Sequence, residues 1–307
     1  MFKLPDGIPT LRSQAQEWAD YAEYLALKNG QVSLFNIIKA PMMVSDETEV
    51  NGIDDTTDRF NEKADEISNE INHRIGLAPK RYPFSVGDKG YTIVFEDADT
   101  PSFWVYKFLL YTTRLQMTKS KVQAGLDGTL LFERLAAEVA QEYFGDNSEV
   151  EIMGTSRSHI GGFRSKLAAL THRMKEGGDI HPHPGFKPQD DNVDVVLWKG
   201  FTDQLPSQLI AFGQCKTGTS WSDKLSELNT EAFCKTWFTR QPVLTPLRMF
   251  FCAQYFPREI WLPRANEAGL VFDRFRIIDY LPEEPSTALM DDIKQWCGAA
   301  SSLYSDN

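Results

Sequence analysis

The order of apolar patterns in the second half of the chain limits the fold more than any other feature. Runs with apolar residues at helical spacing alternate there with short apolar runs of strand length. Helices alternating with strands predict an α/β fold, in which helices flank a mixed central sheet. The predicted helices are residues 125–145, 163–176, 222–238, 257–268 and 286–303, and the predicted strands are 193–198, 208–216, 247–254 and 270–280.

The first part of the chain has a different pattern. Residues 11–29 predict a helix ended by Gly30, and residues 53–76 predict a second, polar and acidic helix. Alternation around a Gly-bearing turn predicts a hairpin at 82–97, and residues 102–117 predict a buried helix. We therefore expect two parts: a helical and hairpin region, 1–120, and an α/β domain, 121–307.

Composition points to a protein of the cytoplasm. The chain has 307 residues and no apolar run of the roughly 20 residues that a membrane helix needs. Its N-terminus lacks the basic-then-apolar order of a secretory signal. The four cysteines (Cys215, Cys234, Cys252 and Cys297) show no CxxC pairing, so we expect reduced, mostly buried thiols instead of a zinc site or a disulfide framework.

Three polar residues in two predicted strands form the candidate site. Asp194 interrupts the apolar run VDVVLW, where a lone carboxylate costs free energy unless something compensates it. Gln214 and Lys216 stand two residues apart in QLIAFGQCK, so alternation places them on one face and Cys215 on the other. If the two strands pair as a hairpin, the three side chains converge.

An acid, an amide oxygen and an ammonium suit the hydrolysis of a phosphodiester. Asp194 and the Gln214 carbonyl could bind a hard divalent cation, Mg²⁺ or Mn²⁺, which prefers oxygen ligands. The cation would polarise the phosphate and lower the pKa of a bound water, while Lys216 orients the water or stabilises the developing charge. The alternative is a buried Asp194 that is neutralised by Lys216 alone, without a metal.

A family resemblance accompanies these residues. The string DDNVDVVLWKGF…LIAFGQCKTGTSW resembles the core of PD-(D/E)XK nucleases, in which an Asp is followed by (D/E/Q)-x-Lys on the next strand. It is most similar to the endonuclease modules of prokaryotic anti-phage effectors of the CBASS and Lamassu types, with GTLLFERLA upstream and FDRFRI downstream. The resemblance covers roughly residues 100–280 and implies a restriction-endonuclease-like core.

The resemblance also implies a helix-borne glutamate as a further metal or supporting ligand. Glu133 in LFERLA matches that position best, and Glu138 and Glu142 are the alternatives, although both also fit a solvated helix face. Asp190 matches a further acidic position. Gln214 departs from the family's usual acid, so we expect weaker metal binding until DNA phosphates complete the coordination.

Several basic or metal-ligating residues near the site have two interpretations. Arg164, Lys166, Arg173 and Lys175 could follow a DNA backbone or belong to a solvated helix face. His181 and His183, in a proline-containing loop, could bind a metal or DNA. Asp273-Arg274-x-Arg276 is interpreted as a structural ion-pair cluster on a strand, with phosphate contact as the alternative.

The predicted function is cleavage of double-stranded DNA with little sequence preference, as the effector of an anti-phage system. Related signalling effectors carry a sensor domain, for which the roughly thirty residues after FDRFRI leave no room. Control would then come from oligomerisation or from partners, by analogy an SMC-like ATPase. The rival hypotheses are a stand-alone, sequence-specific restriction enzyme and a non-catalytic DNA- or protein-binding subunit.

Charge bears on such partners. The net charge of −11 disfavours a polyanion, but residues 41–70 hold ten acidic and only two basic side chains, so the acidity is local. This segment could dock a basic partner, keep DNA off the site, or be a solvated helix.

Overall fold

The computed structural model describes residues 8–10, 12–45, 53–87, 89–115, 117–154, 160–182, 192–218 and 221–302. The chain divides into two compact units, residues 1–116 and 117–307. The boundary expected from the sequence, after residue 120, is four residues later than this one. No helix in the described part of the chain is both long and apolar enough to cross a membrane.

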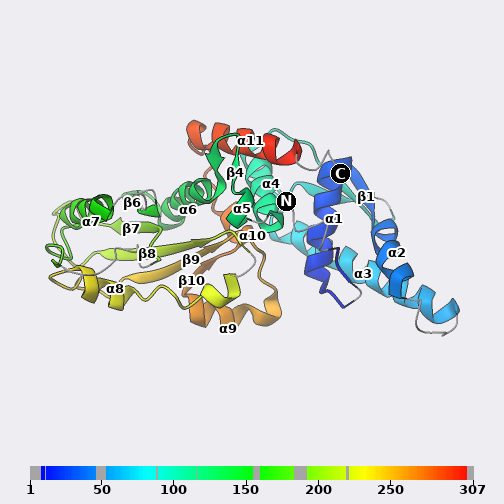
Figure 1. The fold of residues 1–307 in the computed structure, drawn as a ribbon, viewed down its shortest axis with the longest axis horizontal. Helices are drawn as coiled ribbons and strands as arrows, with labels where there is room; N and C mark the ends of the chain where they lie inside the picture. Colours follow the sequence, from blue (N-terminus) through cyan, green and yellow to red (C-terminus); the bar gives the residue numbers. More distant parts are fainter. Residues whose placement is uncertain are drawn as a thin grey trace. The chain divides into compact units, whose positions relative to one another are not determined.

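The C-terminal unit is built on a five-stranded mixed sheet, in the order β10-β9-β8-β7-β6 (Figure 1). Strands β6, β7 and β8 pair antiparallel, whereas β8, β9 and β10 pair parallel. The predicted α/β class with a mixed central sheet is therefore confirmed. The strands are β6 (Ser148–Ile152), β7 (Val195–Lys199), β8 (Leu209–Lys216), β9 (Leu247–Cys252) and β10 (Leu270–Phe272).

Helices cover both faces of this sheet. Helix α6 (Gly128–Phe144) packs on one face, with α11 (Thr287–Ser302) against it. On the other face, side chains of α7 (Ile160–Met174) and α8 (Thr230–Trp237) share a core with β7 and β8, and α9 (Arg258–Ala268) packs beside β9. Burial of apolar side chains on both faces provides most of the stabilisation of such a sandwich.

Local signals explain the limits of several elements. Asp127 begins α6 by accepting a hydrogen bond from Thr129 N (2.9 Å), and Gly145, with φ of 78°, ends it. The preceding residues form a short helix and a two-stranded hairpin: α5 (Met117–Ser120), β4 (Val122–Gln123) and β5 (Leu126–Asp127).

Two predicted elements are wrong in extent, and strand β6, like the short strands β4 and β5, was not predicted. The strand expected over 270–280 ends at Phe272, because Asp273 caps a short helix, α10 (Arg274–Asp279). The helix expected over 222–238 is a 3-10 turn, η3 (Trp221–Lys224), followed separately by α8, which Asn229 caps through Ala232 N. Edge strand β6, with the sequence SEVEI, lacks the apolar run on which the other strand predictions rested.

The N-terminal unit combines helices with a small antiparallel sheet, in the order β1-β3-β2. The hairpin predicted at 82–97 is confirmed, as are the three predicted helices, whereas β1 and α2 were not predicted. Its elements are α1 (Ala15–Asn29), β1 (Gln31–Ser33), α2 (Leu34–Ser45), α3 (Ile53–Leu77), β2 (Phe84–Val86), β3 (Thr92–Phe95) and α4 (Pro101–Arg114).

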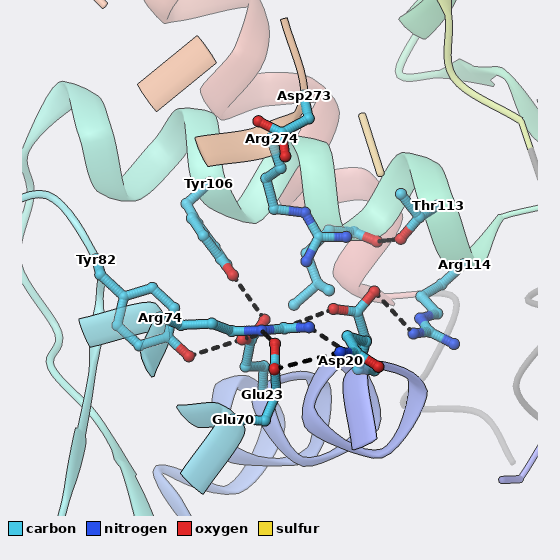
Figure 2. Close-up of polar contacts among 12 residues, drawn as sticks. Asp20, Glu23, Glu70, Arg74, Tyr82, Tyr106, Thr113, Arg114, Asp273 and Arg274 are labelled. Atoms are coloured by element: carbon cyan, nitrogen blue, oxygen red, sulfur yellow. Dashed lines mark hydrogen bonds and ion pairs between the residues drawn. The ribbon is translucent and has the colours of Figure 1, made fainter. Parts of the chain in front are cut away.

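A buried polar network joins these elements (Figure 2). The guanidinium of Arg74, fully buried on α3, donates to Asp20 (2.7 Å) and Glu23 (2.6 Å) of α1 and to Glu70 (2.8 Å). Tyr82 and Tyr106 also donate their hydroxyl hydrogens to the Glu23 carboxylate, at 2.7 and 2.8 Å. Buried charges require such partners, so the network specifies how α1, α3 and α4 pack.

The described acidic residues of segment 41–70 lie within helix α3. Asp58, Glu62 and Glu66 are exposed, while Glu70 turns inward to Arg74. This distribution suits the solvated helix face among the three interpretations of the segment. Residues 46–52 lie outside the described residues.

Candidate active site

Asp194 lies immediately before β7, and both its backbone N–H and its backbone carbonyl form hydrogen bonds. Its N–H donates to Gly213 O (2.8 Å), and its carbonyl accepts from Met153 N (2.7 Å). The side chain is only 2% exposed, and its Oδ2 accepts a hydrogen bond from Cys215 N (2.7 Å). This bond offsets part of the cost of burying a carboxylate and aims the side chain toward the end of β8.

Gln214 and Lys216 lie at the end of β8, on one face, as the alternation predicts. Both reach the same atom: Glu227 Oε2 accepts from Gln214 Nε2 at 3.0 Å and lies 3.4 Å from Lys216 Nζ. The antiparallel register of β7 and β8, continued by one residue, places Asp194 opposite Gln214. The three predicted residues therefore occupy adjoining ends of two paired strands.

Glu227 is a site residue that the sequence did not reveal. It follows the η3 turn, and its neighbours Leu225 and Leu228, each 1% exposed, anchor the segment in the core. Its other oxygen, Oε1, accepts from Lys224. Partial burial raises the pKa of Glu227, but the bonds from Lys224 and Gln214 and the charge of Lys216 together lower it. Glu227 therefore carries a charge near neutral pH.

The contact with Glu227 determines which way the Gln214 amide points. An ionised carboxylate only accepts hydrogen bonds, so the NH₂ group of Gln214 must face it. The carbonyl atom Oε1 then faces the other way, fully buried, and has no hydrogen-bond partner among the described residues. A buried amide oxygen without a donor costs about 1–3 kcal/mol, and a cation at that position would remove this cost.

Glu133 is the one buried glutamate among the three on α6 that the resemblance suggested. It is 2% exposed, and its carboxylate lies directly against Gly154: a Cβ at that position would stand 1.9 Å from Glu133 Oε2. Gly154 follows Met153, whose N–H bonds to the carbonyl of Asp194. Glu133 therefore reaches the strand segment beside Asp194.

The other acidic candidates lie elsewhere. Glu138 accepts hydrogen bonds from Ser286 N (3.1 Å) and Ser286 Oγ (2.6 Å), which connects α6 to the segment before α11. Glu142 is exposed. Asp190 lies outside the described residues.

The donor set fits a hard cation better than a soft one. In the described part of the chain, no three histidine, cysteine or acidic side chains gather closely enough to hold a metal ion. Asp194 and the buried Gln214 Oε1 instead supply a carboxyl oxygen and an amide oxygen, the kinds of donor that Mg²⁺ and Mn²⁺ accept. The cysteines are free, and only Cys215 is partly exposed, as expected for reduced thiols.

Three of the four predicted DNA-binding residues have partners within the protein. Arg164 donates to His181 O (2.6 Å). Lys166 pairs with Glu151 (3.1 Å), and Arg173 pairs with Glu149 (3.0 Å) and Glu151 (2.8 Å) of β6. Lys175 is exposed just after α7. The pairs of Lys166 and Arg173 attach α7 to edge strand β6, and the bond of Arg164 attaches α7 to the segment at His181.

Two further motifs are structural where they are described. Asp273 is not on a strand: its carboxylate accepts from Arg276 N (3.0 Å) and Phe256 N (3.2 Å), so it caps α10 and holds a neighbouring loop. Arg274, fully buried, donates through Nε to Ala253 O (3.0 Å). His181 donates its backbone N–H to Trp237 O, while His183 lies outside the described residues.

A groove of about 530 Å³ is formed by residues of the N-terminal unit. Side chains of α1, β1 and α2 form it, and its lining holds no charged group. Such a lining suits neither a phosphate nor a metal ion. The lining residues are Ile8, Tyr21, Leu25, Asn29, Gln31, Val32, Ser33, Asn36, Ile37 and Thr92.

The interpretation of the candidate site depends on this geometry and on the resemblance of its motifs. Comparison with known proteins finds no matching protein-family model, no matching curated protein and no matching solved structure.

Proposed function

We propose that the protein is a divalent-metal-dependent endonuclease with a restriction-endonuclease-like core, and that it hydrolyses phosphodiester bonds of double-stranded DNA. The observation that carries the proposal is the Gln214 carbonyl oxygen at the strand position opposite Asp194, which is buried and receives no hydrogen bond from the described residues. Lys216, two residues further on the same face, supplies the positive charge that phosphate chemistry requires.

The roles follow from the chemistry of each group. Asp194 and Gln214 would hold Mg²⁺ or Mn²⁺, with Glu133 as the further carboxylate beside them. When bound, the cation polarises the phosphate and lowers the pKa of a coordinated water. Lys216, whose side chain is 26% exposed, can reach a phosphate arriving from solvent and stabilise the charge that develops on it.

The biological setting is proposed from the resemblance of the motifs. In such a setting the protein would cleave DNA with little sequence preference and would be held inactive until a signal arrives. Because Lys166 and Arg173 form ion pairs with acidic residues of β6, the described face near α7 offers less free positive charge to a DNA backbone than its sequence suggests. This supports control by partner subunits or oligomerisation that bring the site to DNA.

Cleavage of supercoiled plasmid in Mg²⁺ or Mn²⁺, with and without the products of neighbouring genes, tests the proposal. We expect nicked and linear products from the wild type and a loss of at least about 100-fold in rate for Asp194→Asn and Lys216→Ala, because each removes a group that acts on the transition state. The exposed pair Asp291→Asn and Lys235→Ala provides matched controls that should keep full activity.

The outcomes separate the candidate functions. Cleavage that both site variants retain would disprove the site assignment. Cleavage at defined sequences by the chain alone would indicate a restriction enzyme. No cleavage under any condition, with DNA still bound, would indicate a non-catalytic binding subunit.

A further inference from the structure

We propose that Glu227 is a positioning residue for Gln214: it holds the amide so that the carbonyl oxygen, and not the NH₂ group, faces the cation site. The inference rests on the proposed function, because it assigns a purpose to the orientation of one of the proposed ligands. Glu227 lies outside the D…QxK motif, on a later segment of the chain.

An amide needs such a residue where a carboxylate would not. A glutamate at position 214 would present an oxygen whichever way its carboxylate rotated, but the two ends of a glutamine amide are opposite in polarity. Rotation by half a turn would aim the NH₂ group, a donor, at the cation. The 3.0 Å bond from Gln214 Nε2 to Glu227 Oε2 forbids that rotation, since the carboxylate cannot donate to the carbonyl.

Glu227 itself is held firmly enough to act in this way. Lys224 bonds to Oε1 and Lys216 lies 3.4 Å from Oε2, so both carboxylate oxygens have cationic partners. Glu227 lies between Leu225 and Leu228, and the buried side chains of these two leucines hold the backbone on both sides of it. Supporting hydrogen bonds of this kind typically change metal affinity by about 10-fold to 100-fold.

The test measures Mn²⁺ binding to the full-length chain by the loss of the free-ion electron paramagnetic resonance signal, without DNA. Glu227→Gln removes the constraint, because an amide at 227 can offer either end to Gln214. We expect it to weaken Mn²⁺ binding about 10-fold to 100-fold. The swapped pair, Gln214→Glu with Glu227→Gln, no longer depends on the orientation of position 214, and we expect it to bind Mn²⁺ at least as tightly as the wild type.

Asp223→Asn is the matched control, because it removes one negative charge from the same segment, as Glu227→Gln does, while Asp223 is exposed and bonds to Ser222 and not to Gln214. Its Mn²⁺ affinity should equal that of the wild type. If it instead weakens Mn²⁺ binding as much as Glu227→Gln does, Glu227 acts only through its charge and the inference is wrong. Thermal unfolding of each variant shows that the fold is retained.

The remaining outcomes distinguish this inference from the proposed function. Wild-type protein that binds no Mn²⁺ at millimolar concentration contradicts the proposed metal site itself. Wild-type binding that Glu227→Gln leaves unchanged overturns the positioning role alone, and the proposed function then stands.

Discussion

The carboxylate of Glu133 fills the space that a side chain at position 154 would need. Both Oε1 and Oε2 lie within 2.6 Å of the place of a Cβ at Gly154, and Glu133, which α6 carries, is buried. A glycine is required here for close approach and not for unusual backbone angles. The side chain of Glu133 and the backbone at Gly154, just after β6, therefore limit each other's position.

Gly154→Ala should reduce the free energy of unfolding by about 1–3 kcal/mol, because the buried carboxylate must shift to admit the methyl group. Urea denaturation followed by fluorescence measures the change. Adding Glu133→Ala should remove most of the penalty, so the two substitutions are not additive.

Gly298→Ala in α11 is the control for Gly154→Ala, because nothing lies within 4 Å of its Cβ position. It should stabilise the protein by about 0.5–1 kcal/mol. Equal effects of the two glycine substitutions would contradict the contact between Glu133 and Gly154.

At the scale of elements, side-chain caps decide where strands end and helices begin. Asp127, Asn229 and Asp273 each accept a hydrogen bond from a backbone N–H in the first turn of the helix that follows. Asp273 does more, because its second oxygen also holds Phe256 N. The turn from β10 into α10 depends on this one carboxylate.

Asp273→Ala should lower the free energy of unfolding by about 2 kcal/mol, since it removes a cap and leaves Phe256 N–H buried without an acceptor. Asp273→Asn should cost less, because an amide oxygen still caps the helix. Urea denaturation of both variants, beside Asn229→Ala as an exposed cap, tests the order. A loss for Asn229→Ala as large as for Asp273→Ala would show that the bond to Phe256 contributes nothing.

At the scale of the whole molecule, each unit has its own interior, and the two are built differently. The sheet of the C-terminal unit is covered by apolar side chains on both faces. The N-terminal unit encloses an ionic network around Arg74 with three carboxylates, those of Asp20, Glu23 and Glu70. The consequences of a core substitution should therefore be local to one unit.

Arg74→Met leaves these buried carboxylates without their main cation, which typically costs about 3–5 kcal/mol. Hydrogen exchange should accelerate in α1 and α3 and stay unchanged in β7 and β8. The exposed Lys80→Met is the control and should change neither. Equal acceleration in β7 and β8 would mean that the two units unfold together.

The sequence by itself predicted the long periodic elements and the α/β class of the C-terminal unit. It brought Asp194 and Gln214 together only on the condition that their strands pair, and the structure shows that they do. These predictions are possible because the apolar residues that face the core recur at the period of the helix or strand that carries them. It missed β6, whose SEVEI alternates acids with apolar residues at the sheet edge, where Glu149 and Glu151 pair with Arg173. It also extended β10 through a helix cap.

Only the tertiary structure decided what surrounds the predicted residues. Glu227 stands thirteen positions after Gln214 and carries no motif, yet the fold brings its carboxylate to both Gln214 and Lys216. Gly154 admits Glu133 only because β6 and α6 meet there. Local patterns specify which residues are buried, but the contact of one side chain with another depends on packing between distant segments, and that packing determines the orientation of the candidate site.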